Sequence, residues 1–289
     1  MTAVRASFRT RFEAAATKNH SLLCVGLDPD PARIPAGVST REFLMRIVEA
    51  TADIACCYKP NLGFFEPDLG AGVELVRDLI EEIHARGIPV LLDAKRGDIG
   101  NTAIGYAKAV FEALDADAVT LSPYLGGDSL EPFLAYEDRT SFILCRTSNP
   151  GARDLQDLRV SSSESAGIPG GGERQEPLYA YVARLANGWN AHNNIGLVVG
   201  ATYPQEAREI RAICPDMPIL MPGVGAQAGD LEAAVQAGID GNGGNLIVNA
   251  SRGVLYAPPV ASSDRPDWAQ GARVAAIELR DAINAARGA

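Results

Sequence analysis

The decapeptide PVLLDAKRGD at residues 89–98 contains the pattern that decides the fold. Its first half is a short apolar run typical of a buried strand, and charged residues follow directly where the run ends. Asp93 and Lys95 are two positions apart, so a continuing strand would aim both side chains to one side. Asp98 follows Gly97, which permits a turn. We therefore expect a strand that ends in a cluster of charged side chains.

Seven further apolar runs occur along the chain, and most are followed by a stretch of helical periodicity. Short strands that alternate with helices are typical of a parallel sheet, and eight such units predict one closed (β/α)8 TIM barrel of the α/β class. The alternative, a doubly wound open sheet, is disfavoured because no G-x-G-x-x-G motif follows the first run. The candidate strands span residues 22–27, 54–59, 89–93, 118–121, 142–146, 195–199, 219–221 and 246–249.

The length of 289 residues accommodates one barrel of about 250 residues with extra segments, so we expect a single domain over residues 1–289. Residues 1–20 contain Phe8 and Phe12, four positions apart, and predict a helical extension over one end of the domain rather than a transit peptide. Residues 158–176 contain serine and glycine triplets without an apolar period and predict a mobile loop insertion.

Composition argues against several classes of function. Acidic residues outnumber basic ones by 36 to 26, and a net charge of −10 disfavours binding to nucleic acid or an anionic membrane. No apolar run approaches the ~18–20 residues that span a bilayer. The five cysteines form no C-x-x-C pair, which predicts reduced thiols and a cytoplasmic protein. None of the three histidines follows a candidate strand, which disfavours catalytic triads and His-ligated zinc.

Charged side chains follow several strands at the edge where barrel enzymes carry out catalysis. Asp28 follows the first strand, Lys59 ends the second, Asp93 ends the third, and Lys95 and Asp98 come shortly after it. They predict an alternating Lys/Asp array in one pocket, although a solvated ion-pair network would give the same pattern. Flanking carboxylates favour a protonated Lys95, which suits proton donation better than Schiff-base chemistry. Two aspartates also suit a metal, but an ammonium between them competes with a divalent ion.

Two loops predict a phosphate site. PGVGAQAGD at residues 222–230 follows the seventh strand, and Arg252 and Gly253 follow the eighth. The loops after these two strands commonly bind phosphate in such barrels, and a guanidinium can hold phosphate through two hydrogen bonds. Gln227 can bind the same group. Simple turns would give the same glycine pattern, and no G-x-x-x-x-G-K-[ST] motif is present, which excludes an ordinary P-loop.

Together, residues 22–256 resemble orotidine 5′-phosphate decarboxylase in its longer, type 2 bacterial form. The most specific element is D-x-K-x-x-D at Asp93, Lys95 and Asp98. The other matching motifs are GLD at 26–28, YKPN at 58–61, TSNPG at 147–151, PGVGAQ at 222–227 and NASRG at 249–253. The resemblance implies a homodimeric (β/α)8 barrel without cofactor or metal. It also implies conversion of orotidine 5′-phosphate to uridine 5′-phosphate and CO2 in de novo pyrimidine synthesis.

The resemblance further implies a role for each matching residue. Lys95 would deliver a proton to C6 of the pyrimidine, beside the departing carboxylate that Asp93 faces. Lys59 would hold Asp93 and Lys95 in place and bind the ribose hydroxyls with Asp28. The partner subunit would supply Asp98, Ile99 and Thr102. Either Ser148 or Ser122 would contact the pyrimidine. The phosphate would be held by Gln227, Arg252 and Gly253.

Two other functions remain open at this point. Related barrels with D-x-K-x-x-D, similar to keto-gulonate phosphate decarboxylases and hexulose phosphate synthases, act on sugar phosphates with Mg²⁺. They place an acidic metal ligand after the second strand, where this chain has Lys59. The other candidate is a barrel that binds a nucleotide but has lost catalysis, which the complete set of charged residues disfavours.

Overall fold

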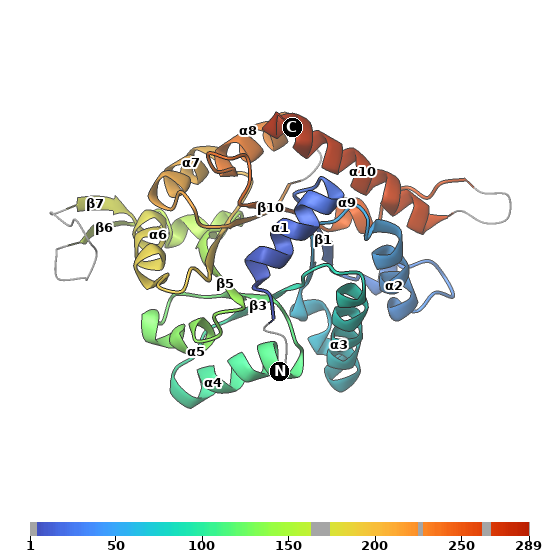
Figure 1. Cartoon of the computed structure of the whole chain (residues 1–289), viewed down its shortest axis with the longest axis horizontal. Helices are drawn as coiled ribbons and strands as arrows, with labels where there is room; N and C mark the ends of the chain where they lie inside the picture. The colour runs from blue at the N-terminus through green and yellow to red at the C-terminus, as the bar shows by residue number, and fades with distance from the viewer. Residues whose placement is uncertain (1–4, 163–173, 225–227, 262–266, 289) are drawn as a thin grey trace.

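The structure is a computed structural model that describes residues 5–162, 174–224, 228–261 and 267–288 (Figure 1). Its main sheet has eight parallel strands in the order β2-β1-β10-β9-β8-β5-β4-β3. Single bridges, Tyr58 to Val90 and Asn61 to Asp93, join the two edge strands and nearly close the barrel. The strands are β1 Leu23–Leu27, β2 Cys57–Pro60, β3 Leu91–Arg96, β4 Ala118–Leu121, β5 Thr140–Arg146, β8 Ile195–Val199, β9 Ile219–Pro222 and β10 Leu246–Ala250. The predicted barrel is confirmed, strand by strand.

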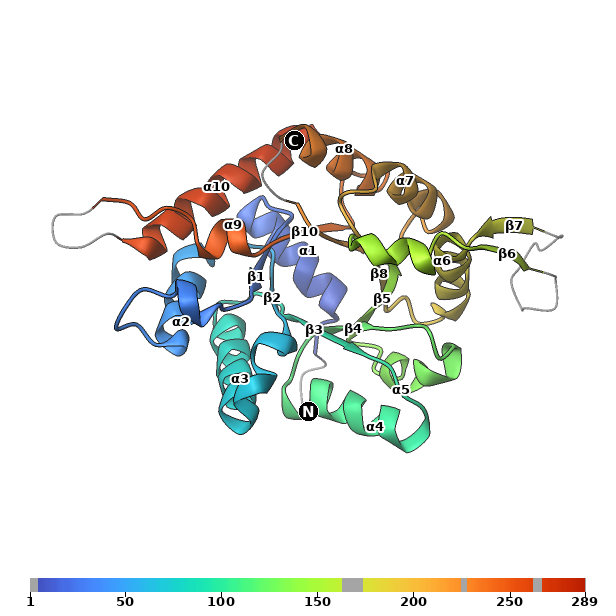
Figure 2. The same cartoon turned by 180° about the vertical axis from the view of Figure 1, so that it is seen from behind.

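Helices surround the strands on the outside of the barrel (Figures 1 and 2). Their apolar residues recur at helical spacing: Phe43, Leu44, Ile47 and Val48 form the buried face of one of them, α2, and Ser39 caps its first turn. The helices are α1 Phe8–Asn19, α2 Thr40–Thr51, α3 Leu69–Ala85, α4 Gly100–Lys108, α5 Glu131–Leu134, α6 Leu178–Trp189, α7 Pro204–Ile213, α8 Ala228–Gly238, α9 Arg252–Leu255 and α10 Trp268–Arg287.

Helix α1 covers the amino-terminal end of the barrel, as predicted for the N-terminal extension (Figure 1). The Phe8 ring meets the Phe142 ring of β5 edge-on, with 5.7 Å between centroids. The buried Asp117 forms ion pairs with Arg5 and Arg11 and a hydrogen bond of 2.7 Å with His84 Nε2. These ion pairs and the aromatic contact fasten the extension to the strand starts, which leaves the opposite end of the barrel for the site.

The insertion differs from its prediction. Residues 159–162 and 174–177 pair as an antiparallel ribbon, β6 Arg159–Ser162 with β7 Arg174–Pro177. The expectation of a loop over 158–176 was therefore wrong for both ends of the segment, because the polar residues there satisfy their backbone groups by pairing across the ribbon. The ribbon projects away from the barrel (Figure 1), and residues 163–173 between its strands lie outside the described residues.

The five cysteines are buried free thiols. Within the described ranges, no helix combines the length and apolarity required to cross a membrane.

Candidate active site

Two lysines from neighbouring strands share the carboxylate of Asp93. Lys59 Nζ on β2 lies 2.8 Å from Asp93 Oδ2, and Lys95 Nζ lies 2.6 Å from Asp93 Oδ1. Lys59 and Asp93 are only 3% and 9% exposed, whereas about half of the Lys95 side chain is exposed. The predicted array therefore exists for these three residues, with one ammonium buried and the other facing an open space.

The backbone of Lys95 is not that of a regular strand. Its φ is +46°, in the left-handed region that non-glycine residues rarely adopt. The pairing register between β3 and β4 shifts between Leu92 and Arg96 as well. Alternation was expected to aim Asp93 and Lys95 to one side, and despite the irregularity both side chains line the same cavity, with the ammonium against the carboxylate. Strained backbone of this kind concentrates at functional sites.

Thr120 on β4, which the sequence reasoning missed, fixes this geometry. Its hydroxyl donates to Asp93 Oδ1 at 2.9 Å and accepts from the Lys95 backbone N–H at 2.9 Å. Thr120 is 1% exposed, so both hydrogen bonds are shielded from water. A polar residue inside the apolar run 118–121 was the signal that could have revealed it.

Electrostatics keep Asp93 and Lys59 ionised. Burial raises the pKa of Asp93, but the ammonium groups of Lys59 and Lys95 outweigh burial and lower that pKa to about 2. Burial lowers the pKa of Lys59, but the carboxylates of Asp93 and Asp28 outweigh it and raise that pKa overall. Asp28 thus belongs to the same electrostatic cluster. At neutral pH the site therefore contains fixed charges of both signs.

The array borders a cavity of about 410 Å³ at the carboxyl ends of the strands, a volume suited to a small molecule. Its walls combine the charged array with apolar side chains and the loop after β5. The lining residues are Lys59, Asp93, Lys95, Thr120, Leu144, Thr147, Ser148, Asn149, Gln156, Val198, Leu220 and Pro222. A charged cluster beside apolar walls can bind a polar, partly aromatic molecule and exclude bulk water from it.

The two candidate serines occupy different places. Ser148 lines the cavity, wedged against Gly200, where a Cβ would lie 2.9 Å from the serine Cβ. Ser122 instead lies against Gly97, and its backbone N–H donates to the carbonyl of Arg96 at 2.8 Å. The position of Ser148 fits the predicted contact with a ring in the cavity, and Ser122 does not line that space.

Asp98, Ile99 and Thr102 do not line the cavity of their own chain. Asp98 Oδ1 accepts from the Ile99 backbone N–H at 2.8 Å, Ile99 is 58% exposed, and Thr102 is exposed. Asp98 was expected to flank Lys95, but within the described chain only Asp93 pairs with that lysine. These residues lie at or just before the start of α4, where Ile99 and Thr102 are exposed and Asp98 is half-buried.

The predicted phosphate residues are only partly described. Arg252 and Gly253 begin α9 directly after β10, and both are exposed. Gln227 lies outside the described residues, so its role stays a prediction. Asp28 follows β1, and its Oδ1 is buried without a hydrogen-bond partner among the described atoms.

A buried arginine that the sequence reasoning missed supports the loop after β5. Arg146 is fully buried, with its guanidinium carbon 3.9 Å from the centroid of the Tyr203 ring. It pairs with Asp157 at 3.1 Å and donates to Gln156 Oε1 at 3.2 Å. Gln156 Oε1 also accepts from the Thr147 backbone N–H at 2.8 Å. Arg146 and Gln156 therefore hold the loop in the shape that presents Ser148 to the cavity.

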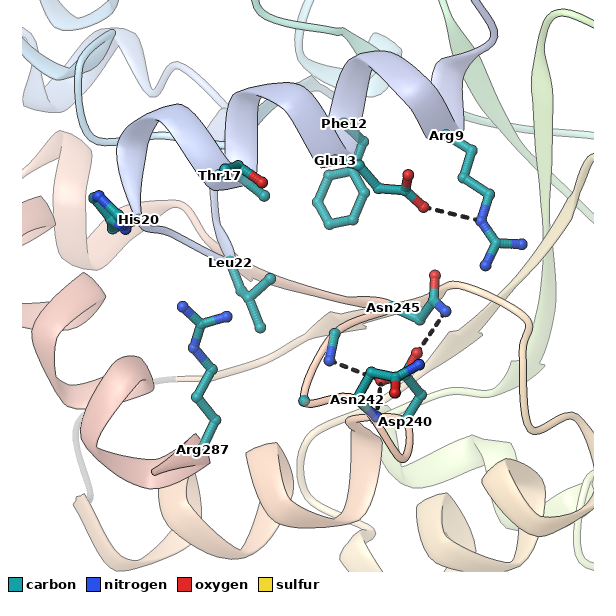
Figure 3. A pocket seen from close by; sticks show the side chains of 13 residues that line it. Arg9, Phe12, Glu13, Thr17, His20, Leu22, Asp240, Asn242, Asn245 and Arg287 are labelled. Carbon is teal, nitrogen blue, oxygen red and sulfur yellow. Dashed lines mark hydrogen bonds and ion pairs between the residues drawn. The ribbon is translucent and has the colours of Figure 1, made fainter. Parts of the chain in front are cut away.

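A second cavity, of about 470 Å³, lies at the opposite end of the barrel between α1 and residues 240–245 (Figure 3). Three of its charged side chains already bind one another or the backbone, whereas Arg287 has no ion pair among the described residues. Arg9 pairs with Glu13 at 3.2 Å, and Asp240 accepts from the Asn245 side chain at 2.7 Å and from two backbone N–H groups. This second cavity contains none of the predicted site residues and borders the amino-terminal ends of the strands. We therefore assign the chemistry to the first cavity.

Comparison with known proteins gives one family. A family model described as "Orotidine 5'-phosphate decarboxylase / HUMPS family" matches residues 21–265. The chain is 51% identical to the orotidine 5′-phosphate decarboxylase of Roseiflexus castenholzii, over 97% of this chain and 98% of that protein. It is 50% identical to the protein of the same name from an Azoarcus species, over 97% and 99% of the two chains.

Solved structures agree with the sequence relatives. The OMP decarboxylase of Leishmania donovani superimposes with a TM-score of 0.81 at 41% identity, over 98% of this chain and 99% of that one. A Toxoplasma gondii protein described as a putative orotidine-monophosphate-decarboxylase gives a TM-score of 0.84 at 35% identity, over 98% and 97%. Both similarities extend over the whole barrel.

Proposed function

Because the chain belongs to the orotidine 5′-phosphate decarboxylase / HUMPS family, we propose that it decarboxylates orotidine 5′-phosphate to uridine 5′-phosphate in pyrimidine biosynthesis, with Lys95 as proton donor. Because decarboxylation breaks a carbon–carbon bond, the protein is a carbon–carbon lyase. The observation that carries the mechanism is the ion triad in which Asp93 lies between Lys59 and Lys95 at the cavity wall.

The triad suits a reaction that develops negative charge on carbon. Loss of CO2 from a pyrimidine leaves a carbanion at C6, and an ammonium fixed beforehand beside that carbon stabilises the charge without reorganisation. Lys95 is the exposed ammonium of the pair, and Asp93 and Thr120 fix its place. The ammonium N–H bond breaks as the C6–H bond forms, while Asp93 repels the carboxylate that leaves.

Binding of the remote phosphate can contribute to catalysis. We place the phosphate near Arg252 and Gly253, at the opposite end of the nucleotide from the reacting carbon. Energy from that contact can offset the cost of holding a substrate carboxylate against Asp93. The pyrimidine would lie against Ser148, and the ribose against Lys59 and Asp28.

The direct test is the loss of orotate-ring absorbance when the purified protein meets orotidine 5′-phosphate. Lys95→Ala should abolish this change while uridine 5′-phosphate still binds, since the phosphate contacts lie elsewhere. Unchanged turnover in Lys95→Ala would refute the mechanism. Binding without turnover in the unsubstituted protein would favour the nucleotide-binding barrel that lacks catalysis.

Chelation separates this proposal from the Mg²⁺-dependent sugar-phosphate enzymes of related barrels. Both carboxylate oxygens of Asp93 are engaged by ammonium groups, and Lys59 stands where those enzymes place an acidic ligand. In the described part of the chain, no three His, Cys, Asp or Glu side chains form a group suited to a metal. We expect full activity in EDTA; a strict requirement for Mg²⁺ would favour the sugar-phosphate reaction.

We further propose a cytoplasmic homodimer in which Asp98, Ile99 and Thr102 complete the partner's site. Exposed apolar side chains around α3 and α4 support a buried interface there, and a groove of about 300 Å³ between these helices contains Val73 and Tyr106. The exposed apolar residues of this face are Phe64, Val73, Ile99, Ile104 and Tyr106.

Mixed subunits test the shared site. A dimer of Asp98→Ala with Lys59→Ala contains one intact site, because all the other groups of that site come from the Asp98→Ala subunit. We expect activity to reappear on mixing. Lys59→Ala mixed with Lys95→Ala is the matched control, because both substitutions remove groups of the same subunit and leave no intact site. Full activity in a strictly monomeric species would contradict the proposal.

A further inference from the structure

Three polar atoms at the carboxyl ends of β1 and β10 are buried without a hydrogen-bond partner among the described atoms: Asp28 Oδ1, Asn249 Oδ1 and Ser251 Oγ. Leaving such atoms unpaired costs free energy, so native proteins generally satisfy them with water or a ligand. The reaction scheme above uses neither Asn249 nor Ser251. Three unpaired atoms within one region indicate a place that a polar ligand completes.

The register of β10 aims Asn249 into the barrel. Asn249 pairs with Pro222 of β9 on one side and with Cys24 of β1 on the other. Paired residues of neighbouring strands face the same side of the sheet, and Pro222 lines the cavity beside Lys95. Asn249 is 7% exposed, so its amide oxygen is buried on the same inner side as that cavity.

The missing side chain of Gly26 leaves room for Asn249 and Ser251 to pack against β1. A Cβ at this position would lie 2.8 Å from the Ser251 Cβ and 3.3 Å from Asn249 Oδ1. Gly26 is also the register partner of Lys59. Asn249 and Ser251 therefore pack against the backbone of β1 at the level of Lys59, next to the place where a ligand would contact that lysine.

The chemistry of the three atoms selects the ligand group. A carboxylate oxygen and an amide oxygen only accept hydrogen bonds, and a serine hydroxyl both accepts and donates. A phosphate offers mostly acceptors and would leave two of the three atoms unpaired, whereas sugar hydroxyls donate. We propose that Asn249 and Ser251, together with Asp28, form a subsite for the ribose hydroxyls, and that Asn249 discriminates ribose from deoxyribose. This inference rests on the proposed function.

Nucleotide binding by calorimetry tests the subsite without requiring turnover. The probes are uridine 5′-phosphate and its 2′-deoxy and 3′-deoxy analogues, titrated into the full chain and into Asn249→Leu, which removes the amide at nearly constant volume. We expect Asn249→Leu to weaken uridine 5′-phosphate about tenfold, the equivalent of about 1.4 kcal/mol, and to leave the affinity of one deoxy analogue unchanged. Asn242→Leu, an exposed asparagine at the far end of the barrel, is the matched control.

The effect of Asn249→Leu on the affinities of the three nucleotides decides whether the subsite exists. Unchanged affinity for uridine 5′-phosphate, or equal weakening of all three nucleotides, would overturn the subsite. If Asn249→Leu does not fold, Ser251→Ala undergoes the same comparison, because it removes one small hydroxyl. Failure of the unsubstituted folded protein to bind uridine 5′-phosphate would instead refute the proposed function itself.

Discussion

Replacing Asp93 by asparagine would leave two ammonium groups without their shared counter-ion. Lys59 is 3% exposed, and Asp93 is the only carboxylate that pairs directly with it in the described part of the chain. Removing one partner of a buried ion pair typically costs about 3–5 kcal/mol. The pKa of Asp93, lowered from 3.8 to about 2 by the two lysines against the opposing effect of burial, independently corresponds to about 2 kcal/mol. We therefore expect Asp93→Asn to lower the free energy of unfolding by about 2–4 kcal/mol at pH 7.

The pH dependence has a definite sign. The folded-state pKa of Asp93 lies below the unfolded value, so its contribution is fully present above about pH 4 and is lost as the pH falls toward 2. About half should be lost by pH 3. The stability gap between the unsubstituted protein and Asp93→Asn should therefore narrow over this range, while turnover is lost at every pH.

Urea unfolding at pH 7, 4 and 3 measures both effects. The matched control is Asp216→Asn, which changes an exposed aspartate that forms no ion pair among the described residues and should alter stability by less than about 0.5 kcal/mol. Equal stability of Asp93→Asn and the unsubstituted protein at pH 7, or a gap that does not change between pH 7 and 3, would refute this account of the triad.

Three other substitutions probe the supports of the site. Arg146→Leu should lower kcat/KM at least tenfold and the free energy of unfolding by about 2–4 kcal/mol, because it removes a buried ion pair and the stacking on the Tyr203 ring. An unchanged kcat/KM would contradict the positioning role of Arg146. Gly26→Ala should lower the thermal midpoint and weaken nucleotide binding, because the added Cβ would lie 2.8 Å from the Ser251 Cβ. The control is Gly70→Ala in α3, which should leave stability unchanged or raise it, because open space surrounds that position. Asp117→Asn should lower the free energy of unfolding by about 2–4 kcal/mol at pH 7, because Arg5 and Arg11 lose a buried counter-ion. An unchanged midpoint in urea unfolding would show that these pairs contribute nothing.

Much of the fold was predictable because its signals are local. Each barrel strand is a short apolar run, and each long helix repeats its apolar residues at its own period, so neighbouring residues alone specify the elements. The position of Lys59, Asp93 and Lys95 at the ends of such runs predicted that they would meet, because all parallel strands of a barrel end on one face. The resemblance to a family added the roles that spacing alone cannot assign.

Contacts between distant segments could not be read in this way. The ribbon of 159–162 with 174–177 has no apolar alternation, so only the pairing itself reveals it. Thr120 lies inside one candidate strand and Arg146 ends another. The function of each depends on which atoms the neighbouring strands and loops bring within hydrogen-bond distance.

The sequence by itself determined the eight barrel strands and the identity of the charged residues at their ends, since periodicity and residue type are local properties of the chain. Only the tertiary structure decided that Lys95 bends back in a left-handed conformation, that Asp93 has both oxygens occupied, and that Asn249 faces the same interior as Pro222. Those facts depend on strand register, and a shift of one residue would turn each side chain to the other face of the sheet.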